Sequence, residues 1–200
     1  MPGPTPMVLQ HFDIDTLAAS PWKNGGGITR EIVCSPAGAG MDHFDWRVSI
    51  ATVERPGLFS AFAGVDRVIM LLEGAGMRLH SPDGGIDHRL DMRQVPYAFP
   101  GDAALMCEPL NGPSTDFNVM ARRGCLRPEV RVLHASGTVA PARQGLLLAL
   151  SGRWQVGEFT CEPGAGLWWD GSVQSWRVNS PDAGAALVAV RLEPASPIAK

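Results

Sequence analysis

The stretch Pro21-Trp22-Lys23-Asn24-Gly25-Gly26-Gly27-Ile28-Thr29-Arg30-Glu31-Ile32 is the part of the chain that differs most from ordinary globular sequence. Its three consecutive glycines have no Cβ and accept positive φ angles, which indicates a tight bend leading into a strand. Polar and aromatic side chains crowd around that bend. We therefore predict that it forms one wall of a pocket; the alternative is a glycine-rich hairpin turn that binds nothing.

Glycine and proline recur along the whole chain and separate short apolar runs. The 200 residues include 23 Gly and 17 Pro, and this punctuation is typical of short strands joined by turns. We therefore predict an all-β fold with little helix. The hydrophobic content of 45% is sufficient for the core of one large domain or of two small fused ones.

Two further segments alternate between apolar and polar residues, as half-buried strands do. In the first, Arg47 and Ser49 share the face opposite the apolar one; in the second, Asp116, Asn118 and Arg122 do so. Such groups on an inner strand face suit a polar-lined barrel, because buried charge in a plain sandwich core would need partners. The alternative for Arg47 and Ser49 is a solvated sheet face.

The charge balance argues against two classes of partner. A net charge of -3 provides no basic surface for nucleic acid or for an anionic membrane. The apolar runs are far shorter than the roughly 20 residues of a membrane-spanning helix. Residues 1–6 lack the basic and apolar regions of a secretory signal. We expect a cytoplasmic protein whose four widely spaced cysteines, Cys34, Cys107, Cys125 and Cys161, are free buried thiols.

Several kinds of chemistry lack their sequence signatures. The five histidines form no closely spaced pair, so we expect no metal site. The glycines are not followed by Lys-Ser or Lys-Thr and lead into a strand, unlike those of a P-loop or a dinucleotide fingerprint. No Gly-x-Ser-x-Gly elbow indicates a nucleophile. We therefore predict no cofactor and no catalytic residue.

The polar residues that remain suit a small anion. Arginine and lysine can clamp a carboxylate, while hydroxyl and amide groups can hold an amide or an imidazole. The two acids can pair with the arginines or accept a hydrogen bond from a ligand N–H. The alternative is that arginines and acids only neutralise each other inside the fold. The candidate ligand-binding residues are Trp22, Lys23, Asn24, Gly25, Gly26, Thr29, Arg30, Glu31, Arg47, Ser49, Asp116, Asn118 and Arg122.

Four motifs together resemble the HutD/Ves family. They are the stretch from Pro21 to Ile32, Phe44-Asp45-Trp46-Arg47-Val48-Ser49-Ile50-Ala51, Gly57-Leu58-Phe59-Ser60 with Asp66-Arg67, and Gly112-Pro113-Ser114-Thr115-Asp116-Phe117-Asn118-Val119-Met120. The match runs in order over about residues 10–123, with Gly57-Leu58 where the family usually has Gly-Pro. Beyond Gly124 the resemblance is weaker.

The resemblance implies a bicupin, in which two cupin-like β-barrels, each a double-stranded β-helix, are fused into a single compact unit over residues 1–200. Residues from about 1 to 123 would form the half with the site, and those from about 124 to 200 a mainly structural half. It also implies a metal-independent accessory or regulatory protein of histidine utilisation that binds a small carboxylate such as urocanate or N-formylglutamate. Members usually lack the metal-binding histidines of other cupins.

Two other functions remain open. The first is a cupin-type enzyme acting on a related carboxylate, with Glu31 or Asp116 as general base; we expect binding rather than catalysis. The second is a protein-interaction module, for which the tryptophans of residues 154–176 would form an exposed apolar patch. Pairing of edge strands would allow a homodimer in each case.

Overall fold

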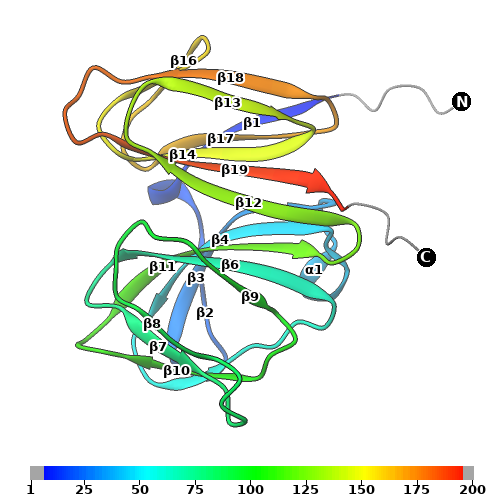
Figure 1. Cartoon of the computed structure of the whole chain (residues 1–200), viewed down its shortest axis with the longest axis vertical. Helices are drawn as coiled ribbons and strands as arrows, with labels where there is room; N and C mark the ends of the chain where they lie inside the picture. The colour runs from blue at the N-terminus through cyan, green and yellow to red at the C-terminus, as the bar shows by residue number, and fades with distance from the viewer. Residues whose placement is uncertain (1–6, 196–200) are drawn as a thin grey trace, which may run out of the picture. The chain divides into compact units, whose positions relative to one another are not determined.

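The computed structural model of the chain describes residues 7–195 and contains almost only β-strands (Figure 1). The contacts divide the chain into two units. The first unit comprises residues 18–127, and the second comprises residues 7–17 together with 128–194. The expectation that residues 1–6 are not a secretory signal concerns residues outside the described range. The all-β prediction is confirmed, since the described residues contain only one short α-helix and one 3-10 helix.

The first unit consists of a larger and a smaller antiparallel sheet. The helix α1 (Gly40–His43) lies in the connection between two strands of the larger sheet. The larger sheet has the strand order β2 (Ala19–Pro21), β3 (Gly27–Ser35), β4 (Trp46–Val53), β11 (Ser114–Arg122), β6 (Val65–Glu73) and β9 (Tyr97–Pro100). The smaller sheet has the order β5 (Gly57–Phe59), β10 (Leu105–Pro109), β7 (Met77–His80) and β8 (Asp87–Leu90).

The register of the larger sheet brings polar residues of separate strands onto one face. Arg47 of β4 lies opposite Met120 of β11, which in turn lies opposite Arg67 of β6. In the next row of this face, Ser49 lies opposite Asn118. Directly paired residues of adjacent strands point to the same side of a sheet. The polar faces predicted for β4 and β11 therefore lie side by side in the sheet, and Arg67 of β6, a strand expected to be very apolar, lies on the same side.

An apolar core packs beside this polar face. It is formed by residues of both sheets, including Ile69, Leu71, Met77 and Leu79, whose exposed fraction is 0%. Burying one such side chain stabilises the fold by about 1.5–3 kcal/mol. The polar residues are thus held on a rigid support.

The second unit also consists of a larger and a smaller sheet. The 3-10 helix η1 (Ile14–Thr16) follows its first strand and is capped by Asp13, whose carboxylate accepts from the Asp15 N–H at 2.9 Å. The larger sheet has the order β1 (Val8–Asp13), β17 (Ala165–Asp170), β14 (Gln144–Ser151), β19 (Ala186–Pro194) and β12 (Leu126–Leu133). The smaller sheet has the order β13 (Gly137–Ala142), β18 (Gln174–Asn179), β15 (Trp154–Val156) and β16 (Phe159–Cys161).

The strand β1 lies in the second unit although it comes first in the chain. Val8 pairs with Asp170 and Asp13 pairs with Ala165 in an antiparallel ladder. This differs from the expected division, in which residues 1 to about 123 form one half. The physical reason is that backbone hydrogen bonds to β17, rather than nearness in sequence, determine the sheet to which β1 belongs.

Three of the tryptophans in residues 154–176 fill the interior of the second unit. Trp154 and Trp169 have an exposed fraction of 0%, and Trp176 of 8%. The indole N–H of Trp154 donates to the Ser151 carbonyl at 3.1 Å, and that of Trp169 to the Ala142 carbonyl at 2.9 Å. These three side chains therefore do not form the exposed apolar patch that a protein-interaction module would need.

The four cysteines are free thiols, as predicted. Cys107 and Cys161 are buried, but Cys34 is half-buried and Cys125 is exposed. The prediction of burial is wrong for Cys125. This residue lies in the turn after β11, where its N–H donates to the Arg122 carbonyl at 3.1 Å, and turns run over the protein surface. In the described part of the chain, no helix is long and apolar enough to cross a membrane.

Candidate functional site

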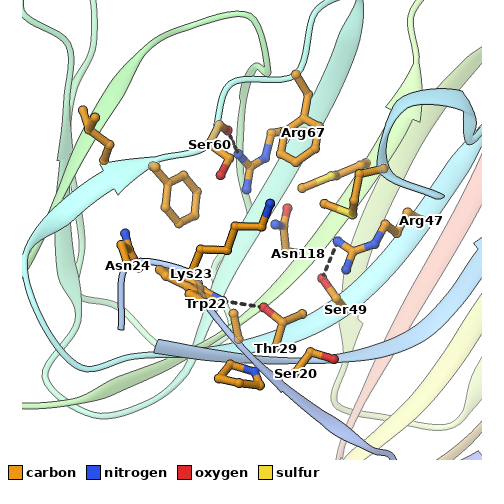
Figure 2. A pocket seen from close by; sticks show the side chains of 17 residues that line it. Ser20, Trp22, Lys23, Asn24, Thr29, Arg47, Ser49, Ser60, Arg67 and Asn118 are labelled. Carbon is orange, nitrogen blue, oxygen red and sulfur yellow. Dashed lines mark hydrogen bonds between the residues drawn. The ribbon is translucent and has the colours of Figure 1, made fainter. Parts of the chain in front are cut away.

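A cavity of about 560 Å³ opens in the first unit. Its walls come from the loop between β2 and β3, from the polar face of the larger sheet, and from β5 with the residues after it (Figure 2). The polar side chains that line it are Ser20, Lys23, Asn24, Thr29, Arg47, Ser49, Ser60, Arg67 and Asn118.

Gly25 and Gly26 lie in the loop of a β-hairpin between β2 and β3, and Gly27 is the first residue of β3. The Trp22 N–H donates to the Gly27 carbonyl at 2.9 Å, and the Gly25 N–H donates to the Trp22 carbonyl at 3.0 Å. Gly25 has a φ of 67°, a left-handed conformation that favours glycine. A Cβ on Gly27 would lie 2.2 Å from the Thr52 carbonyl oxygen, so only glycine fits there. The glycines therefore shape the hairpin, and the preceding side chains line the cavity.

Trp22 and Lys23 form the wall of the cavity on the hairpin side. The Trp22 indole N–H donates to the Thr29 hydroxyl at 2.8 Å, which fixes the ring, and the ring meets Phe59 edge to face with a centroid separation of 6.4 Å. The side chain of Lys23 extends across the cavity in Figure 2. One wall of the cavity is therefore aromatic and carries a flexible cation.

Arg47 is held in place by two side chains of the same sheet. Its Nε donates to Glu31 at 2.7 Å, and its Nη1 donates to the Ser49 hydroxyl at 3.3 Å. The Arg47 side chain is 8% exposed, whereas that of Glu31 is 47% exposed. The pairing leaves Arg47 oriented at the cavity wall, while Glu31 lies beside the lining rather than in it.

Arg67 lines the cavity as a buried cation that the alternation of polar and apolar residues does not predict. Its guanidinium carbon lies 4.4 Å from the ring centroid of Phe59, 5.5 Å from that of Phe62 and 5.1 Å from that of Phe99. Its Nη1 donates to the Ser60 carbonyl at 3.0 Å. Burial lowers the pKa of Arg67 to about 10, against the opposing effect of Asp116. The available sequence signal was Arg67 itself, beside Asp66 at the start of a strand whose next five residues are apolar.

Asp116 is a buried carboxylate behind the cavity lining. It is 0% exposed, and neither of its carboxylate oxygens has a hydrogen-bond partner among the described residues. Burial raises its pKa to about 7, although the positive charge of Arg67 acts in the opposite direction. Unlike Glu31, this acid is not neutralised by direct contact with an arginine.

The remaining candidates lie outside the lining. The Arg122 guanidinium donates to the Asp42 carbonyl at 3.0 Å and to the Phe44 carbonyl at 2.9 Å, so it supports the chain around α1 instead. Arg30 alternates with Thr29 and lies on the opposite face of β3. Gly25 and Gly26 contribute backbone to the hairpin. The candidates that line the cavity are Trp22, Lys23, Asn24, Thr29, Arg47, Ser49 and Asn118.

The lining is electrostatically one-sided. It contains the cations Lys23, Arg47 and Arg67 and no aspartate or glutamate. Cations in a partly buried cavity attract anions more strongly than they would in water. Among residues 7–195, no group of three or more His, Cys, Asp and Glu side chains is placed to hold a metal ion. The arrangement is suited to hold a small anion with an apolar body against the aromatic wall.

The fold and this cavity define a class: an all-β protein of cupin-like architecture with a basic, aromatic-walled pocket. A cupin 2 conserved barrel domain protein from Leptotrichia buccalis has a TM-score of 0.57 over 92% of this chain and 96% of its own, at 9% identity. That likeness concerns the fold alone. Among the described residues the strand orders do not close into a ring of hydrogen bonds.

The family follows from closer relatives. A family model described as HutD matches residues 14–188. Protein Ves of Cronobacter sakazakii is 38% identical over 162 residues, which cover 80% of this chain and 87% of that protein. A crystal structure of a conserved protein of unknown function from Pseudomonas aeruginosa PAO1 has a TM-score of 0.82 at 33% identity, covering 93% of this chain and 99% of the other. HutD from Pseudomonas fluorescens SBW25 has a TM-score of 0.81 at 28% identity, over 94% and 100%. The chain belongs to the HutD/Ves family.

Proposed function

We propose that this protein is an accessory or regulatory component of histidine utilisation that binds a small carboxylate in the cavity of its first unit. Urocanate and N-formylglutamate are the ligands that we propose. Membership of the HutD/Ves family supports the link to histidine utilisation. The chemistry of the cavity supports recognition of a carboxylate.

One observation carries this proposal: the lining holds three basic side chains and no acidic one. An arginine can bind a carboxylate through two parallel hydrogen bonds. Glu31 orients Arg47 by accepting a hydrogen bond from the Arg47 Nε. The Nη2 group of Arg47 has no protein partner among the described residues. The rings of Trp22 and Phe59 suit the flat or apolar body of such a ligand.

We also propose that the two units are the two halves of a bicupin. Each unit pairs a larger with a smaller sheet, and the fold resembles cupin proteins. In this arrangement the first half carries the site, and the second half is structural. The protein is then metal-independent and non-enzymatic, and its response is ligand binding.

Isothermal titration calorimetry with urocanate and N-formylglutamate tests the proposal. We expect saturable binding of at least one ligand. The variants Arg47→Met and Arg67→Met should each weaken it by roughly tenfold or more, because a charge-assisted hydrogen bond is lost. Arg30→Met is the matched control, since it removes a cation from the other face of β3, and its affinity should stay within about twofold. No heat with either ligand at millimolar concentration overturns the proposal.

A second candidate function is favoured by Asp116 alone. A carboxylate with a pKa of about 7 has the basicity of a general base, but Asp116 is 0% exposed and does not line the cavity, so this function also requires the cavity wall to move. Glu31, the other acid considered for this role, is paired with Arg47. Proton NMR of urocanate or N-formylglutamate incubated with the protein distinguishes the two functions. New product signals that Asp116→Asn abolishes would establish catalysis, and unchanged ligand signals would favour binding alone.

A further inference from the structure

The cavity is larger than the two ligands proposed for it. Its volume is about 560 Å³. At the roughly 30 Å³ that a water molecule takes in the liquid, the non-hydrogen atoms of urocanate displace at most about 300 Å³, and those of N-formylglutamate at most about 360 Å³. Cavities of roughly 300–1,000 Å³ hold drug-sized molecules. Either ligand alone would therefore leave a substantial part of this cavity to water.

The cations best placed to bind a carboxylate are the two buried arginines. Arg47 is 6% exposed and Arg67 is 3% exposed, whereas Lys23 is exposed. Burial strengthens a charge-assisted hydrogen bond, because less water competes for the charges. A carboxylate is therefore held best against the two guanidinium groups. The rest of the bound molecule then extends toward the part of the cavity that solvent reaches.

Apolar side chains line that accessible part, and we call three of them the apolar rim: Trp22, Met41 and Phe62. Trp22 and Phe62 are half-buried, and Met41 of α1 is 46% exposed. The ring of Trp22 meets that of Phe59 with a centroid separation of 6.4 Å. The rings of Phe59 and Phe62 lie 4.4 Å and 5.5 Å from the guanidinium carbon of Arg67. Aromatic surface therefore continues from a buried guanidinium to the apolar rim.

Met41 has a setting that other exposed apolar side chains lack. A single exposed apolar residue is ordinary on a protein surface, and Met92, which is 64% exposed and lies outside the cavity lining, is such a residue. Met41, by contrast, lines the same cavity as the aromatic rings and the two guanidinium groups. Methionine is flexible and polarisable, and it packs well against aromatic groups of different shapes. A molecule that covers Met41 from within this cavity also meets the cations.

We infer that the cavity takes an elongated amphipathic acid, whose carboxylate is held by the buried guanidinium groups and whose apolar or aromatic body lies on the apolar rim. This inference rests on the proposed recognition of a carboxylate and names a larger class of ligand than the two compounds proposed above. Affinity then increases with the apolar area that the rim removes from water. Urocanate and N-formylglutamate represent the acid end of this class.

Two pairs of acids, each differing by one aromatic ring, test the inference on the full chain. They are N-formylglutamate with N-benzoylglutamate, and urocanate with its N-benzyl derivative. In calorimetric titrations, we expect the member with the added ring to bind at least about tenfold more tightly, because a buried ring removes a large apolar area from water. Met41→Gln, which keeps the length of the side chain but makes it polar, should reduce that ratio by about threefold or more.

Met92→Gln is the matched control, since it makes the same change at an exposed methionine outside the lining. It should leave the affinity ratio unchanged. Each ratio compares two ligands on one protein, so a partial loss of folded protein in a variant does not alter it.

A second measurement locates the added ring. With methionine labelled with ¹³C in the ε-methyl group, the signals of Met41 and Met92 are assigned by their loss in the two glutamine variants. The ring of N-benzoylglutamate should shift the Met41 methyl signal clearly more than N-formylglutamate does, because a nearby aromatic ring changes the local magnetic field. The Met92 methyl signal should stay in place with both ligands.

Several results would overturn the elongated ligand and leave the proposed function standing. They are binding without a gain from the added ring, a gain that Met41→Gln leaves intact, and a Met41 methyl signal that does not respond to the ring. Equal affinities within each pair, together with weaker self-association of Met41→Gln in sedimentation equilibrium, would assign the apolar rim to a second copy of the chain. Absence of binding by all four acids overturns the proposed function itself.

Discussion

The two units have the same general layout, a larger sheet paired with a smaller one, but their interiors differ in chemistry. Among residues 7–195, the buried polar and charged side chains all belong to the first unit; they are Arg47, Ser49, Arg67, Ser114, Asp116 and Asn118. The buried core cluster of the second unit is entirely apolar. Trp154, Trp169 and Trp176 are buried in the second unit, whereas the first unit contains a cavity of about 560 Å³.

Close packing accounts for the solid interior of the second unit. A Cβ on Gly145 would lie 2.5 Å from the Trp169 ring, so the ring packs directly against the Gly145 backbone. In the first unit, by contrast, Asp116 and Arg67 are buried at a cost in stability. The same layout can therefore enclose either a packed apolar core or a polar cavity.

The largest expected effect comes from emptying the packed interior. Trp169→Ala removes a fully buried ring and its hydrogen bond to the Ala142 carbonyl. We expect the free energy of unfolding to fall by about 3–5 kcal/mol, as for other buried aromatic residues cut to alanine. Urea denaturation, monitored by tryptophan fluorescence, measures this free energy of unfolding. Val173→Ala, at a 60% exposed position, should change stability by about 0.5 kcal/mol or less; a similar loss in both variants would contradict tight packing at Trp169.

Removing the buried carboxyl group of Asp116 should increase stability progressively as the pH rises above about 4, with the full effect at about pH 7 and higher. The native pKa of Asp116 is raised from 3.8 to about 7. Stability of the unmodified protein therefore falls as pH rises from about 4 to about 7 and then levels off. Asp116→Asn should remove this fall, which amounts to at most ~4 kcal/mol at 1.36 kcal/mol per pKa unit.

Denaturation of both proteins between about pH 4 and pH 8 measures the Asp116 effect. Parallel curves for the two proteins would show that Asp116 is paired or hydrated in solution. Asp66→Asn provides the control for an exposed carboxylate, since the Asp66 side chain is 40% exposed.

The hairpin that carries Trp22 and Lys23 should be sensitive to a methyl group at Gly27. Gly27→Ala would place a Cβ 2.2 Å from the Thr52 carbonyl oxygen. We expect a loss of more than about 1 kcal/mol and weaker ligand binding, because the hairpin must move. Gly25→Asn should be nearly neutral, since asparagine tolerates a positive φ and open space surrounds this position. Thermal unfolding compares the stability of the two variants, and calorimetry compares their ligand affinity. Equal stability of both variants would contradict the tight contact between Gly27 and the Thr52 carbonyl.

The smallest expected effect follows from releasing Arg47. Glu31→Gln removes the charge of an acid that is 47% exposed. We expect a change in stability of less than about 1 kcal/mol, as for partly exposed ion pairs. Binding of a carboxylate should become up to a few-fold tighter, because the cation is no longer compensated. Calorimetric titration measures the change; a marked loss of affinity would mean that orientation of Arg47 by Glu31 outweighs its charge.

Local patterns in the sequence were sufficient for a large part of this picture. The spacing of glycine and proline indicated the all-β fold, and alternation placed Arg47 with Ser49 and Asp116 with Asn118. These patterns succeed because a strand exposes every second residue to the same side, whatever its partners are. The four motifs from Pro21 to Met120 sufficed for the family, which the relatives confirm.

Tertiary structure alone decided how those faces meet and which groups enter the cavity. Pairing between strands distant in sequence aligned Arg47 with Met120 and Arg67, and it placed β1 in the second unit. Arg122 is the last residue of β11, and its guanidinium donates to the backbone carbonyls of Asp42 and Phe44. Strand alternation does not predict these hydrogen bonds. The raised pKa of Asp116 likewise depends on how completely other strands exclude water from it. Strand faces are a local property of the chain, whereas register, burial and pKa arise from contacts between distant segments.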